Sequence, residues 1–337
     1  MAHLVETMAY VGNEPWHGLG QRLSPNQSIE RWQREAGMDW QIKEAPVLFN
    51  AEQDSGSLLN LRSNPDTKVL YRSDSLEPLS VVSKRYQTVQ PKEVLEFYRD
   101  LVAAGGFQLE TAGVLKGGRK LWALAKTGQE TMLKGGDKVK AYLLLGTSCD
   151  GTLATTAQFT SVRVVCNNTL QLAVADSRGS VKVPHSTKFD PILVKRELGL
   201  GLSAWERFND SIKLLADRKV NRFETMNLLL EVLGDPALPL NLQPNQKAIQ
   251  NVYSLFSGAG KGADMASANG TAWGLLNGIT EHVDSHRKAM NQDHRLDSSW
   301  FGVGAQIKAK AFESVLSHTI KQSLKYFFYL NTYKAGF

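Results

Sequence analysis

The stretch FQLETAGVLKGGRKLWALAKTGQETMLKGGDKVKAYLLLGTSCDGTLATTAQFTSVRVVCNNTL, residues 107–170, decides the fold of this chain. It holds four runs of β-forming residues, separated by turns that contain Gly-Gly or Asp-Gly. Such turns supply the positive φ angles that tight hairpins need. Short turns between neighbouring strands predict an antiparallel meander. The predicted strands cover residues 107–115, 120–127, 139–147 and 152–160.

The residues after the fourth predicted strand favour a helix. Apolar side chains recur within residues 161–175, and we expect them to lie on one face of the sheet. The sequence therefore predicts an α+β fold, with a curved antiparallel β-sheet, packed helices and a β-β-β-α-like core.

Outward from this stretch, two regions are predicted. Residues 1–190 form an α+β core domain with a basic sheet, and residues 191–337 form a mainly helical C-terminal region. In the first region, Ser28 is placed to cap a helix over residues 29–37, and Pro91 begins another that runs to about residue 104. Strand-like runs occupy residues 40–50, 67–72 and 79–82. In the second region, helical patterns cover residues 191–219, 221–233, 244–256, 271–286 and 307–329.

Composition indicates a protein of a reducing cytoplasm. The chain has 337 residues, of which 42% are hydrophobic and 21% charged, values typical of globular proteins. No apolar run reaches the roughly 20 residues that a membrane span needs, and the first residues lack a secretory pattern. Two cysteines in a chain of this length fit a reducing compartment without a disulfide framework.

Positive charge is concentrated in the middle of the chain. The formal net charge is +6, and residues 107–200 alone contain 13 Lys/Arg against 7 Asp/Glu. Charge of one sign on one element favours an anionic partner such as nucleic acid, although these side chains could also simply solvate the sheet edges. The predicted DNA-binding residues are Lys116, Arg119, Lys120, Lys126, Lys138, Lys140 and Arg163 for phosphates, with Asn167 and Asn168 fixing the backbone beside them.

Motifs for catalysis or for a cofactor are weak. Residues 257–262 read Ser-Gly-Ala-Gly-Lys-Gly, but a phosphate loop needs Ser or Thr after its Lys. His282 and His286 share a helix face with no specified third metal ligand, so a solvated face is the simpler interpretation. Cys166 follows two valines and favours a small buried side chain. We therefore predict no catalytic residues, no metal and no cofactor.

Several runs resemble one family. They are Trp16-His17-Gly18-Leu19-Gly20, residues 86–90, residues 113–125, Ser148 to Gly151 continuing through Arg163-Val-Val-Cys-Asn-Asn-Thr-Leu170, and residues 270–287. Together they are similar to the phage/plasmid-like proteins built on domain of unknown function 932. Cys149 departs from the family pattern, where His is expected, which argues against catalysis at that position.

The resemblance implies a setting of bacteriophages, prophages and conjugative plasmids, without an established activity. The order of elements also resembles, remotely, the core of the Rad-fifty-two-type single-strand annealing proteins. That likeness implies a ring or arc of subunits, with single-stranded DNA in a basic groove.

Three hypotheses follow. The first is a non-catalytic, homo-oligomeric protein that binds and anneals single-stranded DNA in recombination or replication, with host or phage proteins of those processes as further partners. The second is an anti-defence protein that binds and blocks a host nuclease or restriction factor. The third is a hydrolase that uses Asp150, His17 or the pair His282 and His286.

Overall fold

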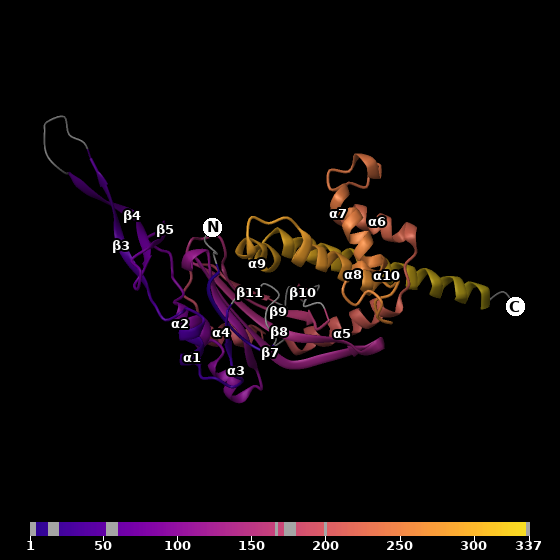
Figure 1. Cartoon of the computed structure of the whole chain (residues 1–337), viewed down its shortest axis with the longest axis horizontal. Coiled ribbons are helices and arrows are strands. Elements are labelled where there is room, and N and C mark those ends of the chain that lie inside the picture. Colours follow the sequence, from indigo (N-terminus) through magenta and orange to yellow (C-terminus); the bar gives the residue numbers. More distant parts are fainter. Residues whose placement is uncertain are drawn as a thin grey trace.

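The computed structural model describes residues 5–12, 20–51, 60–165, 168–171, 180–198 and 201–334. The chain is a mixed α+β structure with a mainly antiparallel central sheet, an open three-stranded sheet and a helical C-terminal region (Figure 1). The predicted fold class is therefore confirmed.

The central sheet has the strand order β10-β9-β8-β7-β6-β1-β2 in the described residues, and β11 also pairs with β9. The four strands β6 to β9 are consecutive antiparallel neighbours, which confirms the predicted meander. The strands are β1 (Val5–Val11), β2 (Gln21–Leu23), β6 (Gln108–Leu115), β7 (Lys120–Leu133), β8 (Asp137–Ser148), β9 (Thr155–Arg163), β10 (Asn168–Gln171) and β11 (Ser180–Val183).

Helices cover both faces of this sheet. The N-terminal helices are α1 (Ile29–Glu35), α2 (Pro91–Glu96) and α3 (Arg99–Ala104), and α4 follows the sheet (Pro191–Leu198). The C-terminal helices are α5 (Gly201–Asp217), α6 (Arg222–Leu233), α7 (Gln246–Ser254), α8 (Ala272–Glu281), α9 (Gln292–Phe301) and α10 (Val303–Lys334).

Strand β7 shows how the two faces are filled. Successive side chains of a strand point to opposite faces. Leu121 and Ala123 belong to a core with α1, α2 and α4, whereas Trp122 and Leu124 belong to a second core with α9. The Trp122 ring meets Trp300 of α9 edge to face, with 4.8 Å between the ring centroids. Helices α5 to α8 and α10 pack with the far ends of β7 and β8 in a third core.

A second sheet forms an arm that projects from the body at the upper left of Figure 1. It consists of β3 (Ile42–Asn50), β4 (Leu61–Arg72) and β5 (Pro78–Ser83), in the antiparallel order β3-β4-β5. Strand β5 pairs only with the part of β4 near the body, so the outer part of the arm is a two-stranded ribbon.

The helix predicted over residues 161–175 is wrong in the described part of that range. Strand β9 continues to Arg163, and residues 168–171 form β10, antiparallel to β9. Valines 162, 164 and 165 are β-branched, and such residues favour a pleated surface over a helix. An apolar run this short has no clear period, which is why the pattern misled.

The helix starts predicted at Ser28 and Pro91 are correct, whereas the helix predicted from residue 307 begins at Val303, and one predicted helix is divided. The Ser28 hydroxyl accepts a hydrogen bond from the Arg31 amide at 3.3 Å, and α2 begins at Pro91. The helix predicted over residues 91–104 is interrupted between Glu96 and Arg99. Helix α9, which covers the second face of the sheet, was not predicted.

Candidate nucleic-acid interface

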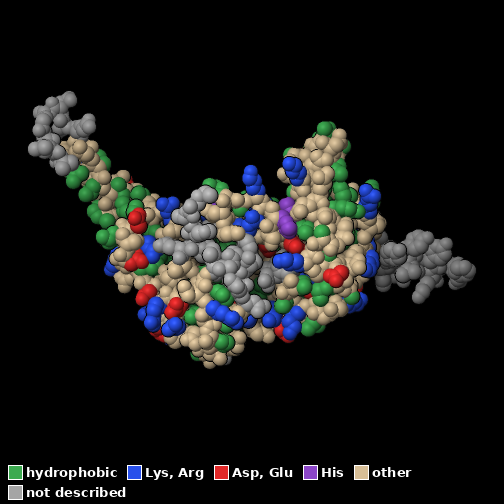
Figure 2. Space-filling view, viewed as in Figure 1, with side chains coloured by type: hydrophobic (Ala, Val, Ile, Leu, Met, Phe, Trp, Pro, Cys, Tyr) green, Lys and Arg blue, Asp and Glu red, His purple; other side chains and the backbone are tan. Residues whose placement is uncertain are grey.

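Five of the seven cations predicted to bind phosphate form ion pairs with carboxylates of the protein itself. Lys116 lies 2.5 Å from Asp297, which also pairs with Lys120. The other pairs are Lys126–Glu110 at 3.1 Å, Lys138–Glu130 at 2.9 Å and Arg163–Asp137 at 2.9 Å. On the face that Figure 2 shows, Lys and Arg side chains lie among Asp and Glu side chains.

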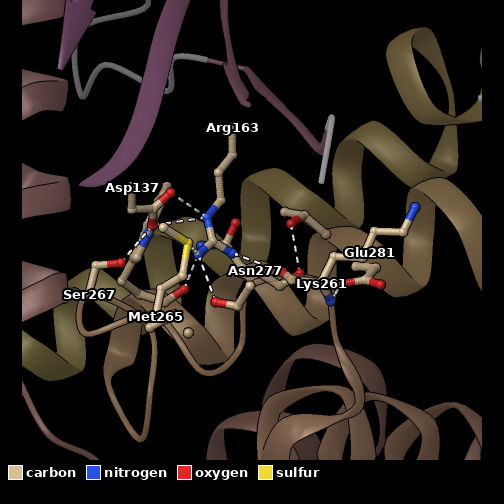
Figure 3. A network of polar contacts seen from close by, with 12 residues as sticks. Asp137, Arg163, Lys261, Met265, Ser267, Asn277 and Glu281 are labelled. Atoms are coloured by element: carbon tan, nitrogen blue, oxygen red, sulfur yellow. Dashed lines mark hydrogen bonds and ion pairs between the residues drawn. The ribbon is translucent and has the colours of Figure 1, made fainter. Parts of the chain in front are cut away.

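Arg163 is the most deeply buried of the five. Its side chain is 2% exposed, and that of Asp137 is 0% exposed. The Asp137 carboxylate also accepts hydrogen bonds from the Ser267 hydroxyl at 2.6 Å and the Trp273 indole at 3.0 Å (Figure 3). A buried carboxylate needs such partners to remain charged. This closed network leaves Arg163 no access to a phosphate in solvent.

The same network fixes the glycine-rich loop of residues 257–262. The Arg163 guanidinium donates to the carbonyl of Gly262 at 3.0 Å, and the Lys261 amide donates to Glu281 at 3.0 Å (Figure 3). The loop therefore joins β9 to α8. Helix α7 and the turn over Leu255–Ala259 lead into the loop, in place of the strand that a phosphate loop follows.

Asp297 connects the β6–β7 turn to α9. Burial alone would raise the pKa of Asp297, but hydrogen bonds from Lys116 and Lys120 lower it below its ordinary value. The carboxylate is thus ionised at neutral pH and is shared by the two lysines, so it offsets one of their two positive charges. Of the remaining predicted residues, Arg119 is exposed and Lys140 half-buried, and neither forms an ion pair with a described residue. Asn167 lies outside the described residues, and Asn168 is described only by its backbone in β10.

A different set of cations meets at one end of the central sheet. This end carries the β6–β7 turn, the β8–β9 turn, the segment after β5 and the segment after β11. We call its exposed cations the basic end. None of them forms an ion pair with a described residue; they are Lys84, Arg85, Arg119, Lys182 and Lys188.

Direct contacts hold these four segments together. The Cys149 amide donates to the carbonyl of Arg119 at 2.9 Å, which joins the two turns. The Tyr86 hydroxyl donates to the carbonyl of Ser148 at 2.9 Å. The Gln87 amide donates to the carbonyl of His185, and Lys182 faces Thr156 in the β11–β9 register. The cations therefore project from one connected part of the backbone.

Gly118 makes the β6–β7 turn possible at this place. Its φ is +100°, and a Cβ there would lie 3.0 Å from the Trp40 ring and 3.1 Å from Leu79. Only glycine combines this conformation with so close an approach. The turn can thus pack against the base of the arm and present Arg119 to solvent.

Tyr86 and His185 lie at the centre of the basic end. Their rings stack with 4.4 Å between centroids and 17° between planes. Burial raises the pKa of Tyr86 to about 12, so the phenol is neutral at physiological pH. The two His185 ring nitrogens each lie 2.9 Å from a carbonyl oxygen, of Gln87 and of Leu153. A neutral imidazole can donate to one of them and an imidazolium to both.

The exposed Asp190 lies two positions after Lys188 and accepts hydrogen bonds from the Ile192 and Leu193 amides of α4. A further carboxylate, Asp150, lies in the β8–β9 turn of the basic end. It accepts hydrogen bonds from the amide and hydroxyl of Thr152 and forms no ion pair with a described residue. Five cations against these two carboxylates leave the described surface positive. The sequence analysis missed four of the five, since Lys84 and Arg85 are about a hundred residues from Lys182 and Lys188. In the sequence, Lys84, Arg85 and Lys182 have no Asp or Glu within three positions on either side, whereas Lys188 has Asp190 two positions away.

Cys149 and His282, two of the described residues considered for catalysis, are buried and hydrogen-bonded within the fold. Burial raises the pKa of the Cys149 thiol to about 12, so little reactive thiolate forms. Burial, followed by the charges of His286 and Arg287, lowers the pKa of His282 to about 4, and its ring bonds to Asn251 at 2.7 Å. Within the described ranges, no three His, Cys, Asp or Glu side chains are grouped to hold a metal. His17 lies outside those ranges.

Lys308 is a second buried cation that serves packing. Burial lowers its pKa, yet the ammonium group donates to Asp284 and Thr169 at 2.7 Å and to Ser299 at 3.0 Å. These three acceptors satisfy all of its hydrogens. Lys308 thus joins α10 to β10, α9 and the turn after α8.

The fold and these contacts define an α+β protein in which a largely buried sheet ends in an exposed cationic surface. Comparison with known sequences identifies its family. Residues 78–300 match the family described as Domain of unknown function (DUF932), and the chain belongs to it. The match spans β5 to α9. It thus contains all four segments that carry the basic end, but not β3, β4 or α10. No curated protein and no solved structure matches this chain. In the described residues, no helix is both long and apolar enough to cross a membrane.

Proposed function

We propose that this chain is a mobile-element protein that binds single-stranded DNA at the basic end and anneals complementary strands in recombination or replication. The observation that carries the proposal is the contrast between the basic end and the paired cations of the β6–β7 turn and of strands β7 to β9. Five exposed cations at the basic end have no carboxylate partner among the described residues, whereas five of the seven cations predicted from the sequence are held by carboxylates. Unpaired surface cations are free to replace the counterions of a phosphate backbone.

Binding led by phosphates suits annealing better than sequence recognition. Contacts to phosphates fix the position of a strand and carry no base information. The base edges of the strand are then left open to pair with a complementary strand. No bond is broken or formed, so the proposal needs no catalytic residue or cofactor. Several copies arranged in a ring or arc would extend one strand over many basic ends.

Salt dependence is the first test. Five phosphate contacts predict a slope of about −3.5 when the logarithm of the affinity for single strands is plotted against that of salt. The measurement is fluorescence anisotropy of a labelled single-stranded oligonucleotide over a salt series. An affinity that does not fall as salt rises would contradict the proposal.

Two double variants separate the basic end from net charge alone. Lys182→Ala with Lys188→Ala removes two unpaired cations, and Lys126→Ala with Lys138→Ala removes two paired ones. Both change the net charge equally. The first variant should flatten the salt slope by about 1.4 and the second should leave it nearly unchanged. Equal losses in both would show that binding follows overall charge, and the basic end would be abandoned as the interface.

The same proteins test annealing and the alternative function. Two complementary labelled strands should pair faster with the wild type than with the Lys182/Lys188 variant. An anti-defence protein would instead capture one stoichiometric host protein without DNA, and its binding would be indifferent to the Lys182 and Lys188 substitutions.

A further inference from the structure

The outer described part of the arm carries apolar side chains that nothing in the described structure covers. Phe49 and Leu48 are 51% and 53% exposed, and Leu61 on the facing strand is 55% exposed. Phe49 lies opposite Arg62 in the register, whereas Leu48 and Leu61 point to the other face of the ribbon. An isolated two-stranded ribbon is marginally stable in water. Its apolar side chains would be stabilised by contact with another surface.

A pocket that could receive such a side chain lies on the helical region. Its volume is about 210 Å³, and Val220, Phe223 and Leu228 form its apolar lining. The rim includes Glu224 and His318. Phe223 is itself 74% exposed, so this part of α6 presents a second uncovered aromatic ring.

The sizes of these two features match. An apolar cavity of about 150 Å³ is large enough to bind benzene, and the side chain of Phe49 ends in a ring of that size. Arg62, beside Phe49, bonds to the neighbouring amide of Asn60 and forms no ion pair with a described residue. Glu224, which lines the pocket, has a carboxylate that can pair with the Arg62 guanidinium of another copy, in addition to its present pair with Arg218.

The positions of the two features exclude contact within one copy. The arm and helix α6 lie toward opposite ends of the long axis of the molecule (Figure 1). We propose that Phe49 of one copy inserts into the Val220–Phe223–Leu228 pocket of a second copy of this chain. The contact is head to tail, since different surfaces meet, and it generates a ring or a filament rather than a closed dimer.

This inference is independent of DNA binding, because neither surface includes a cation of the basic end. Its test uses three full-length variants, each changing one exposed apolar side chain. Phe49→Ser removes the inserting side chain, Phe223→Ser weakens the pocket, and Ile192→Ser is the matched control on α4, where Ile192 is 78% exposed. Light scattering measures the mass over a series of protein concentrations without DNA.

The wild type and the Ile192→Ser variant should assemble beyond dimers as the concentration rises. Phe49→Ser and Phe223→Ser alone should each require at least about tenfold more protein to assemble. An equimolar mixture of these two variants should form dimers and stop there. In that mixture one copy retains the pocket and the other retains Phe49, so a single intact contact remains.

Three results would overturn the inference. The first is a wild type that stays monomeric at all concentrations. The second is an assembly that persists in both variants, which would place the contact elsewhere. The third is a mixture that behaves like either variant alone, as expected for a self-complementary dimer or for an arm that binds a different protein. Circular dichroism of each variant checks that the fold is retained.

Discussion

The paired cations of the sheet strands and the unpaired cations of the basic end have opposite roles in this molecule. Arg163 and Lys120 are buried and each is held by a carboxylate, whereas Lys182 and Lys188 are exposed and have no such partner among the described residues. In sequence the two groups look alike, as lysines and arginines beside β-forming residues. The difference teaches that the excess of positive charge in residues 107–200 has two sources: cations that hold the fold, and cations available to a ligand.

The largest expected effect comes from removing the negative charge of Asp137. Asp137→Asn leaves the Arg163 charge buried without a counter-charge, and we expect a loss of about 3–5 kcal/mol in the free energy of unfolding. Chemical denaturation measures it. The double variant Asp137→Leu with Arg163→Met removes both charges and should recover a large part of the loss. If the free energy of unfolding of Asp137→Asn is less than about 1 kcal/mol below that of the wild type, the pair is not buried as described.

A second prediction concerns how stability depends on pH, and it tests His282, a buried group that is uncharged in the folded protein at neutral pH. The folded-state pKa of His282, about 4, is below the ordinary value of 6.5, so the unfolded chain binds the proton more tightly. The stability that His282 provides is therefore complete above pH 6.5 and is lost as the pH falls toward 4. The expected loss is roughly 3 kcal/mol at most.

The control for that effect is His282→Gln, which can retain a hydrogen bond to Asn251 and does not titrate. Its free energy of unfolding should change less than that of the wild type between pH 7 and pH 5. If the two proteins respond to pH in parallel, another group is responsible for the acid sensitivity.

Lys120 and Arg119 are adjacent in the sequence, and they allow a direct comparison of a paired cation with an unpaired one. Lys120 is 5% exposed and paired with Asp297, whereas Arg119 is exposed and has no described ionic partner. Lys120→Ala should lower the free energy of unfolding by about 2 kcal/mol, less than a full buried pair because Lys116 still neutralises Asp297. Arg119→Ala should leave stability within about 0.5 kcal/mol and flatten the salt slope of single-strand binding by about 0.7.

Denaturation and anisotropy on the same two preparations measure both effects. The contrast fails if Arg119→Ala is the destabilised variant, or if Lys120→Ala is the one that changes the salt slope while remaining stable.

Much of the fold was open to prediction from sequence, and the reason is local chemistry. Glycine-rich turns and alternation specify β6 to β9, and Ser28 and Pro91 specify helix starts, because each of these signals acts within a few residues. The misread segment after β9 lacks a local signal. Val164 and Val165 suit a helix face or a strand equally in pattern, and the antiparallel pairing of β10 with β9 decides between them.

The candidate interface was less accessible to prediction, because ion pairing is a property of residues distant in sequence. Asp297 is more than 170 positions from Lys116 and Lys120, and the segment of Lys84 meets that of Lys188 through the Tyr86–His185 stack and the hydrogen bonds between Gln87 and His185. Arg119 alone among the predicted cations belongs to the basic end. A count of charges along the chain gives the sign of a surface, and the fold determines which charges reach it.

The smallest expected effect is at Lys138, which tests whether a paired cation on the surface behaves like the buried pairs or like the basic end. Its partner Glu130 is exposed, and the ammonium group lies 2.9 Å from the carboxylate. Exposed pairs are worth little, because water screens the attraction and two flexible side chains must be ordered. Lys138→Ala should therefore change the free energy of unfolding by at most about 0.5 kcal/mol. It should also leave the salt slope unchanged, since the pair already neutralises the cation. A slope that flattens by about 0.7 would mean that a DNA phosphate displaces Glu130. In that case a second phosphate contact would lie at the start of β8, and the half-buried Lys140 would be the next residue to substitute.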